Sequence, residues 1–139
     1  VPVACTTEPM PAIQTHRVTG PGTFTIIPVA GSQISVVSTA STNASNQKSS
    51  AGNLFELSVS NPTATAAAVK LYNKATAPTV GTDVPILTIP IAAGAMVSLS
   101  FGELGKRFAT GISMAITAAI AATDTASSVA GVQVHGTYN

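Results

Sequence analysis

The sequence predicts an all-β protein: an antiparallel β-sandwich of the jelly-roll or immunoglobulin-like kind, with an extended N-terminal arm. Short segments alternate between apolar and polar residues, which is the pattern of strands with one buried face. Gly, Pro and Asn separate these segments at short intervals, as in sandwiches and barrels. The chain has 139 residues, of which 45% are hydrophobic. That length and composition are enough for one domain with a real core.

Residues 1–22 are predicted to form the arm, and residues 23–139 a single sandwich domain. The arm holds four of the nine prolines. Proline fixes φ and has no N–H to donate, so this stretch is expected to be extended and irregular. We expect it to lie across a neighbouring subunit, with Pro9, Pro11 and Ile13 as contacts. A frayed terminus is the alternative.

Alternating or β-branched segments follow the arm and are interpreted as strands. They are residues 24–29, 33–38, 54–59, 69–72, 84–91, 97–101, 112–117 and 132–135. In the third segment, Phe55, Leu57 and Val59 are expected on the core face. Prolines in residues 84–91 favour an edge or bulged strand.

Two segments leave room for another interpretation. The Ala-rich stretch 114–122 suits a helix, but the alternation of Ile112, Met114 and Ile116 favours a strand. Residues 38–52 consist of Ser, Thr, Ala, Asn, Gln, Lys and Gly. That composition predicts a long exposed loop that contributes no core residue.

Charge is scarce in this sequence. Charged residues make up 8% of the chain and the net charge is +1, against about 25% charged residues in typical soluble domains. No run of Lys or Arg could neutralise phosphates, which argues against nucleic-acid binding. No apolar stretch reaches the length of a membrane span. A surface with so few charges suggests that partners cover much of it, so a homo-oligomer is expected.

The sequence predicts no catalytic, cofactor-binding or metal-binding site, and therefore no enzyme. His16 and His135 are far apart and fit no metal-ligand spacing. Cys5 is the one cysteine, so an intrachain disulfide is excluded. The carboxylates are isolated, and no glycine-rich loop has the residues of a phosphate site.

Tyr and Arg side chains are common anchors of protein interfaces. On this ground Tyr72, Tyr138, Lys106 and Arg107 are predicted to contact partners. The alternative is that Tyr72 caps a strand and that Lys106 and Arg107 lie in a solvated turn.

The run LYNKATAPTVGTD at residues 71–83 is distinctive. Together with Phe101-Gly102, residues 107–111, Ile116-Thr117 and Asp124-Thr125, it resembles a module of small virion proteins of tailed bacteriophages. The resemblance covers residues 69–139. It implies a β-sandwich with a structural role on the phage particle.

The expected function is therefore that of a capsid decoration (cement) protein on the virion surface. Such a protein would oligomerise, as a trimer by expectation, and bind the major capsid protein through the arm. A head-fibre, tail or baseplate component is one alternative. A carbohydrate- or host-surface-binding module is another, although the chain has no Trp and two Tyr to form an aromatic platform.

Overall fold

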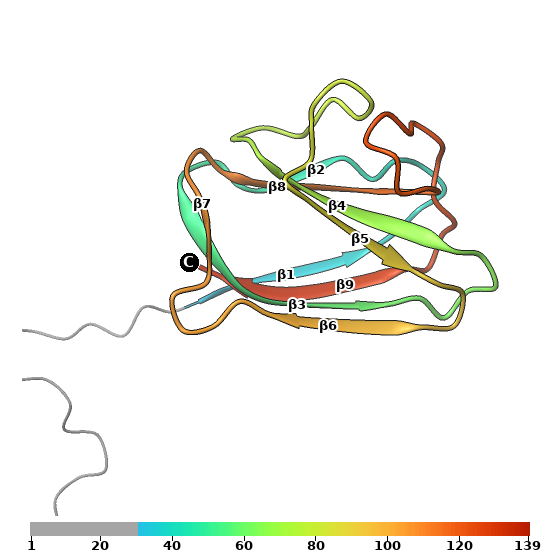
Figure 1. The fold of residues 1–139 in the computed structure, drawn as a ribbon, viewed down its shortest axis with the longest axis horizontal. Coiled ribbons are helices and arrows are strands. Elements are labelled where there is room, and N and C mark those ends of the chain that lie inside the picture. Colours follow the sequence, from blue (N-terminus) through green and yellow to red (C-terminus); the bar gives the residue numbers. More distant parts are fainter. Residues whose placement is uncertain (1–30) are drawn as a thin grey trace, which may run out of the picture.

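The computed structural model describes residues 31–139, which form nine strands in two antiparallel sheets packed face to face (Figure 1). This arrangement confirms the predicted antiparallel β-sandwich. The described residues contain no helix. The arm (1–22) and the predicted strand at 24–29 lie outside the described residues.

The first sheet has β9 and β3 at its centre. In spatial order its strands are β1 (Ser32–Val37), β9 (Gln133–Tyr138), β3 (Gly52–Ser60) and β6 (Met96–Ser100), and β7 (Lys106–Phe108) pairs with the beginning of β3.

The second sheet has β8 and β4 at its centre. Its strands, in order, are β2 (Ser45–Lys48), β8 (Ile112–Thr117), β4 (Ala67–Asn73) and β5 (Leu87–Ile91).

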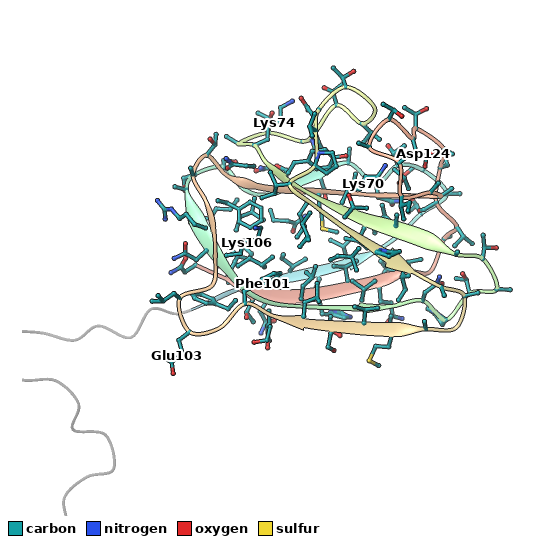
Figure 2. The ribbon with its side chains drawn as sticks, in the orientation of Figure 1. Lys70, Lys74, Phe101, Glu103, Lys106 and Asp124 are labelled. Atoms are coloured by element: carbon teal, nitrogen blue, oxygen red, sulfur yellow. The ribbon has the colours of Figure 1, made fainter. Side chains whose placement is uncertain are left out.

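The core lies between the sheets and is built from every second residue of the central strands (Figure 2). Its largest apolar members are Ile34, Leu54, Leu57, Leu71, Ile91, Phe108, Ile112, Met114 and Ile116. The strand predicted at 112–117 is confirmed over the helical alternative. All six residues of β8 are buried, so this strand is covered on both faces.

One prediction about the core face is wrong, because β3 contains a β-bulge. Leu54 pairs with Tyr138 and Glu56 with the next residue, Thr137, which leaves Phe55 as an extra residue. The extra residue of a bulge shifts the alternation by one, so the side chains on one side of it point to the opposite face of the sheet from the one expected. Leu54 is therefore buried in place of Phe55, which is half-buried, while Leu57 and Val59 face the core as predicted.

The exposed loop predicted at 38–52 is also wrong. Its residues 45–48 form β2, an edge strand paired with β8. Ser38 is buried, where its Oγ donates to the Val129 carbonyl oxygen and accepts from the Val132 N–H. Asn43 adopts a positive φ of 50° and donates from Nδ2 to Ser128 Oγ. Hydrogen bonds of polar side chains hold this segment in place. Because these contacts need no apolar residues, the segment shows no hydrophobic alternation from which a strand could be predicted.

Gly136 tests the packing of the first sheet, because the strands leave no room for a side chain there. A Cβ at Gly136 would lie 2.7 Å from the Glu56 carbonyl oxygen and 3.0 Å from a methyl of Leu57. We expect Gly136→Ala to lower the free energy of unfolding by about 1–3 kcal/mol, as overpacking does. Urea denaturation measures this change. Thr137→Ala, one residue on and on the outer face, is the control; equal losses in both variants would contradict the account.

Candidate functional site

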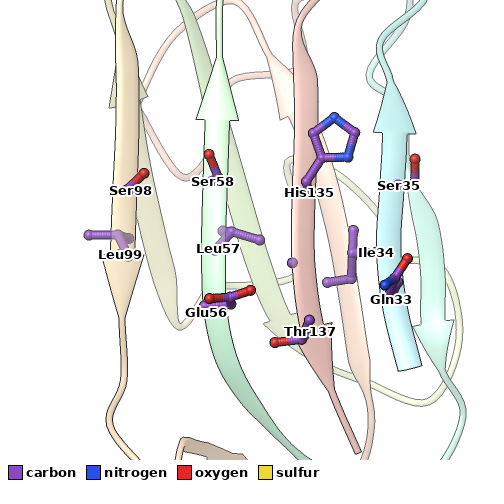
Figure 3. Close-up of a pocket in the computed structure, with 11 residues that line it drawn as sticks. Gln33, Ile34, Ser35, Glu56, Leu57, Ser58, Ser98, Leu99, His135 and Thr137 are labelled. Atoms are coloured by element: carbon purple, nitrogen blue, oxygen red, sulfur yellow. The ribbon is translucent and has the colours of Figure 1, made fainter. Parts of the chain in front are cut away.

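The outer face of the first sheet carries a shallow trough of about 310 Å³ (Figure 3). It runs across the four strands β1, β9, β3 and β6, between two rows of outward-pointing side chains. One wall is a row of cross-strand neighbours formed by Ser35, His135, Ser58 and Ser98. The other wall is formed by Gln33, Thr137 and Glu56.

The floor of the trough is backbone. It is the row between the two walls, formed by Ile34, Gly136, Leu57 and Leu99. Because successive side chains point to opposite faces of a sheet, these residues turn their side chains toward the core. Four strands at about 4.8 Å spacing give the trough a length of about 14 Å.

The chemistry of the trough is polar with little charge. Its walls offer hydroxyls, the amide of Gln33 and the imidazole of His135, and Glu56 is the one carboxylate among the lining residues. Within residues 31–139, no Lys or Arg lines it. These groups can exchange hydrogen bonds with a neutral polar ligand or with another polypeptide chain.

The outer face of the second sheet, by contrast, is covered by two loops, residues 74–86 and 118–132 (Figures 1 and 2). Lys70 on β4 is fully buried beneath the second of these loops. Its Nζ donates to the carbonyl oxygens of Ala121, at 2.6 Å, and Asp124, at 3.3 Å. Burial lowers the pKa of Lys70, and the nearby Asp124 carboxylate opposes this shift. The ammonium thereby ties the loop to the sheet.

The first covering loop is held by an ion pair and by hydrogen bonds. Lys74 Nζ lies 2.5 Å from Asp83 Oδ2, which also accepts a hydrogen bond from the Thr79 N–H. The hydrogen bond from Lys74, and then that from Thr79, lower the pKa of Asp83. Ser113 Oγ lies within hydrogen-bond distance of the Lys74 and Thr76 carbonyl oxygens. The outer face is therefore covered over its central strands, β4 and β8.

Tyr72 lies beneath the same covering and is 1% exposed. The surface contact predicted for it is therefore not available in this structure, because residues 74–86 fold over β4. Tyr138 is half-buried, and its Oη donates to the Gln47 carbonyl oxygen at 2.8 Å. That hydrogen bond ties β9 of one sheet to β2 of the other.

Lys106 and Arg107 lie in the short strand β7, where the alternative had placed a solvated turn. Arg107 is exposed and Lys106 half-buried, so both can reach a partner. The structure does not bring them together with Tyr72, which belongs to the other sheet. Pro9, Pro11 and Ile13 lie outside the described residues.

The trough was not predicted from the sequence. The polar residues that line it stand at every second position of four strands, but the order of the strands is needed to see that they are neighbours.

The described surface also exposes large apolar side chains, which are Val37, Val84, Ile86, Met96, Leu104 and Ile120.

Residues 31–139 hold no group of three or more His, Cys, Asp or Glu side chains placed to bind a metal ion. Within the same range there is no helix long and apolar enough to cross a membrane.

Tyr72→Phe tests the burial of Tyr72 beneath residues 74–86. The buried Tyr72 Oη has no hydrogen-bond partner in the part of the chain that the structure describes, so its removal is expected to change the free energy of unfolding by less than about 1 kcal/mol, or to raise it. Burial raises the pKa of Tyr72 above its usual 10.0. The wild type therefore keeps this proton when folded and loses stability as the pH rises above about 10.

In the Phe variant that loss is absent. The measurement is urea unfolding of both proteins from pH 8 to 11. Lys70 titrates in both proteins, so the difference between them isolates Tyr72. A variant destabilised by several kcal/mol at pH 8 would show that the hydroxyl has a partner after all.

Comparisons of this chain with protein-family models, with curated proteins and with solved structures found no match in any of the three.

Proposed function

We propose that this chain is a non-enzymatic structural protein of a virus particle, a capsid decoration protein that self-associates and attaches to the major capsid protein. The observation that carries the proposal is the character of its surface. Among residues 31–139, six large apolar side chains are exposed, with Leu104 at 87% and Met96 at 69%. The whole chain has only 6 basic and 5 acidic residues to offset them.

Such a surface favours permanent association. Burial of exposed apolar side chains against a partner is favourable, and few charges have to be desolvated in the process. The trough, with one carboxylate among its lining residues, offers hydrogen-bonding groups to a partner. The resemblance of residues 69–139 to small virion proteins of tailed phages supports a phage particle as the assembly. A head-fibre, tail or baseplate position is the alternative within the same class.

The test is the oligomeric state of the full chain and its response to salt and urea. We expect a stable oligomer at micromolar concentration by light scattering, nearly unchanged from low to roughly molar NaCl, because few charges are there to be screened. Urea solvates apolar and peptide groups, so it is expected to dissociate the oligomer. Particles carrying this chain should release it in the same way.

A pair of variants separates the contribution of apolar contacts to association from that of charged contacts. Leu104→Ser removes an exposed apolar side chain and is expected to weaken association, whereas Glu103→Gln removes an exposed charge and is expected to leave it unchanged. A monomer at micromolar concentration would contradict the proposal. So would dissociation by salt alone with resistance to urea.

The trough favours a second candidate, a carbohydrate- or host-surface-binding module. Hydroxyl, amide and imidazole groups in two parallel rows suit a neutral polyhydroxylated ligand. In this case an array of glycans should bind the wild type, and His135→Ala or Glu56→Ala should abolish the signal. Arg107→Gln, outside the trough, is the control. An array without signal would exclude this candidate for the glycans displayed.

A further inference from the structure

The polar side chains in the walls of the trough are free to bind a ligand. Within residues 31–139 none of these side chains makes a hydrogen bond to another protein group; they are Gln33, Ser35, Glu56, Ser58, Ser98, His135 and Thr137. In the second sheet, by contrast, carbonyl groups of the covering loops accept hydrogen bonds from the outward-pointing Lys70, Ser113 and Thr117. The outer face of the first sheet thus keeps its hydrogen-bonding capacity for a ligand.

The two walls also differ from the next row of outward-pointing side chains on the same face. That row runs beside the wall of His135 and consists of Val37, Gln133, Ser60 and Met96. Its two ends are apolar, because Val37 is 57% and Met96 69% exposed. A ligand that lies in the trough meets polar groups along both of its sides, whereas one that lies beside this row would not.

The groups of the trough suit a sugar better than a peptide. The backbone N–H and C=O groups of a sheet are used between its strands, so its face offers a ligand mainly side chains. A peptide brings an N–H and a C=O at nearly every residue, and most of them would stay unpaired on such a face. A sugar brings hydroxyls along both edges of its ring. Each hydroxyl can donate to or accept from the hydroxyl, amide and imidazole groups of the walls.

Charge and shape narrow the class of sugar. Glu56 is the one carboxylate among the lining residues, and within residues 31–139 no Lys or Arg accompanies it, so an anionic sugar would be repelled. The walls run straight across the four strands (Figure 3). This course suits an extended β-1,4-linked chain better than a curved α-1,4-linked one. A ring of such a chain is about as long as one strand spacing, so about three rings fill the trough.

We propose that the trough binds a linear, uncharged, extended oligosaccharide of about three sugar units. The inference deepens the proposed function as a glycan-binding module, on which it rests, by naming the class of glycan. His135 has the only ring among the lining side chains, and its imidazole can bond a hydroxyl or lie against the C–H groups of a sugar. Glu56 lies on the neighbouring strand in the opposite wall, where it accepts hydrogen bonds and excludes acids.

Three trisaccharides test the proposal on the full chain, with binding measured by saturation-transfer difference NMR. Cellotriose is extended and uncharged, and it is expected to bind. Maltotriose has the same glucose units in a curved α-1,4-linked chain. β-1,4-linked triglucuronic acid keeps the linkage of cellotriose and adds carboxylates. Each of the latter two is expected to bind about tenfold more weakly than cellotriose, the first because of its shape and the second because of Glu56.

Three variants assign the binding to the trough. His135→Ala is expected to abolish the cellotriose signal. Gln133→Ala is the matched control, because Gln133 is exposed on the same strand and face but lies outside the trough. Glu56→Gln keeps an accepting oxygen and removes the charge, so it is expected to bind cellotriose as before and triglucuronic acid about tenfold better than the wild type does. Circular dichroism verifies that each variant is folded.

The proposal is overturned if the folded wild type does not bind cellotriose, or if folded His135→Ala binds it unchanged. Equal or tighter binding of maltotriose or of the acid, lost in His135→Ala, would overturn the class of glycan and leave a glycan-binding module standing. A smaller oligomer of His135→Ala or Glu56→Gln in light scattering would show that the trough is a contact between copies, which also overturns the proposal. Light scattering of the wild type tests self-association separately.

Discussion

The pairing of β9 with both β1 and β3 is the contact on which the rest of this structure depends. Three strands far apart in the sequence meet there, and their register decides which side chains face the core. Gly136 lies at the centre of this arrangement, against the Glu56 carbonyl oxygen and the Leu57 side chain. The same register aligns the polar side chains on the outer face into two parallel rows. The trough is therefore a direct product of the pairing that builds the core.

The outer faces of the two sheets differ in how far loops cover them. Among residues 31–139, no loop covers the outer face of the first sheet, whose polar side chains line the trough. The central strands of the second sheet are covered by loops, and the outward-pointing residues of β4 and β8 are buried. Burial of Lys70 is costly, because an ammonium loses its hydration. Carbonyl groups of the covering loop replace that hydration, so the loop and the lysine depend on each other.

This asymmetry bears on how the protein could assemble. Over its central strands the second sheet offers a partner loop surface, whereas among residues 31–139 the outer face of the first sheet offers backbone and hydroxyl groups. Contacts with such groups involve few ions, in agreement with the 8% charged residues of the whole chain. Association through the first sheet would draw mainly on hydrogen bonds, and association through the exposed apolar side chains on their burial.

Much of the fold could be predicted from the sequence, because alternation of side chains is a local property of each strand. The strands at β1, β4, β6 and β8 were found in this way. β2 was missed because an edge strand held by polar contacts has no apolar pattern. The bulge at Phe55 was missed because it depends on the partner strand, β9.

The candidate site was beyond sequence reasoning for the same physical reason. Alternation tells which residues share a face of one strand, but hydrogen bonding between strands decides which faces adjoin. Ser35, Ser58, Ser98 and His135 are neighbours only because β1, β9, β3 and β6 stand in that order. Tyr72 appeared available as a surface residue because the folding of a loop over β4 leaves no mark on β4 itself. The sequence by itself determined the fold class and the scarcity of charge, since both are sums of local properties. Only the tertiary structure decided the trough and the covered face, since each depends on contacts between distant segments.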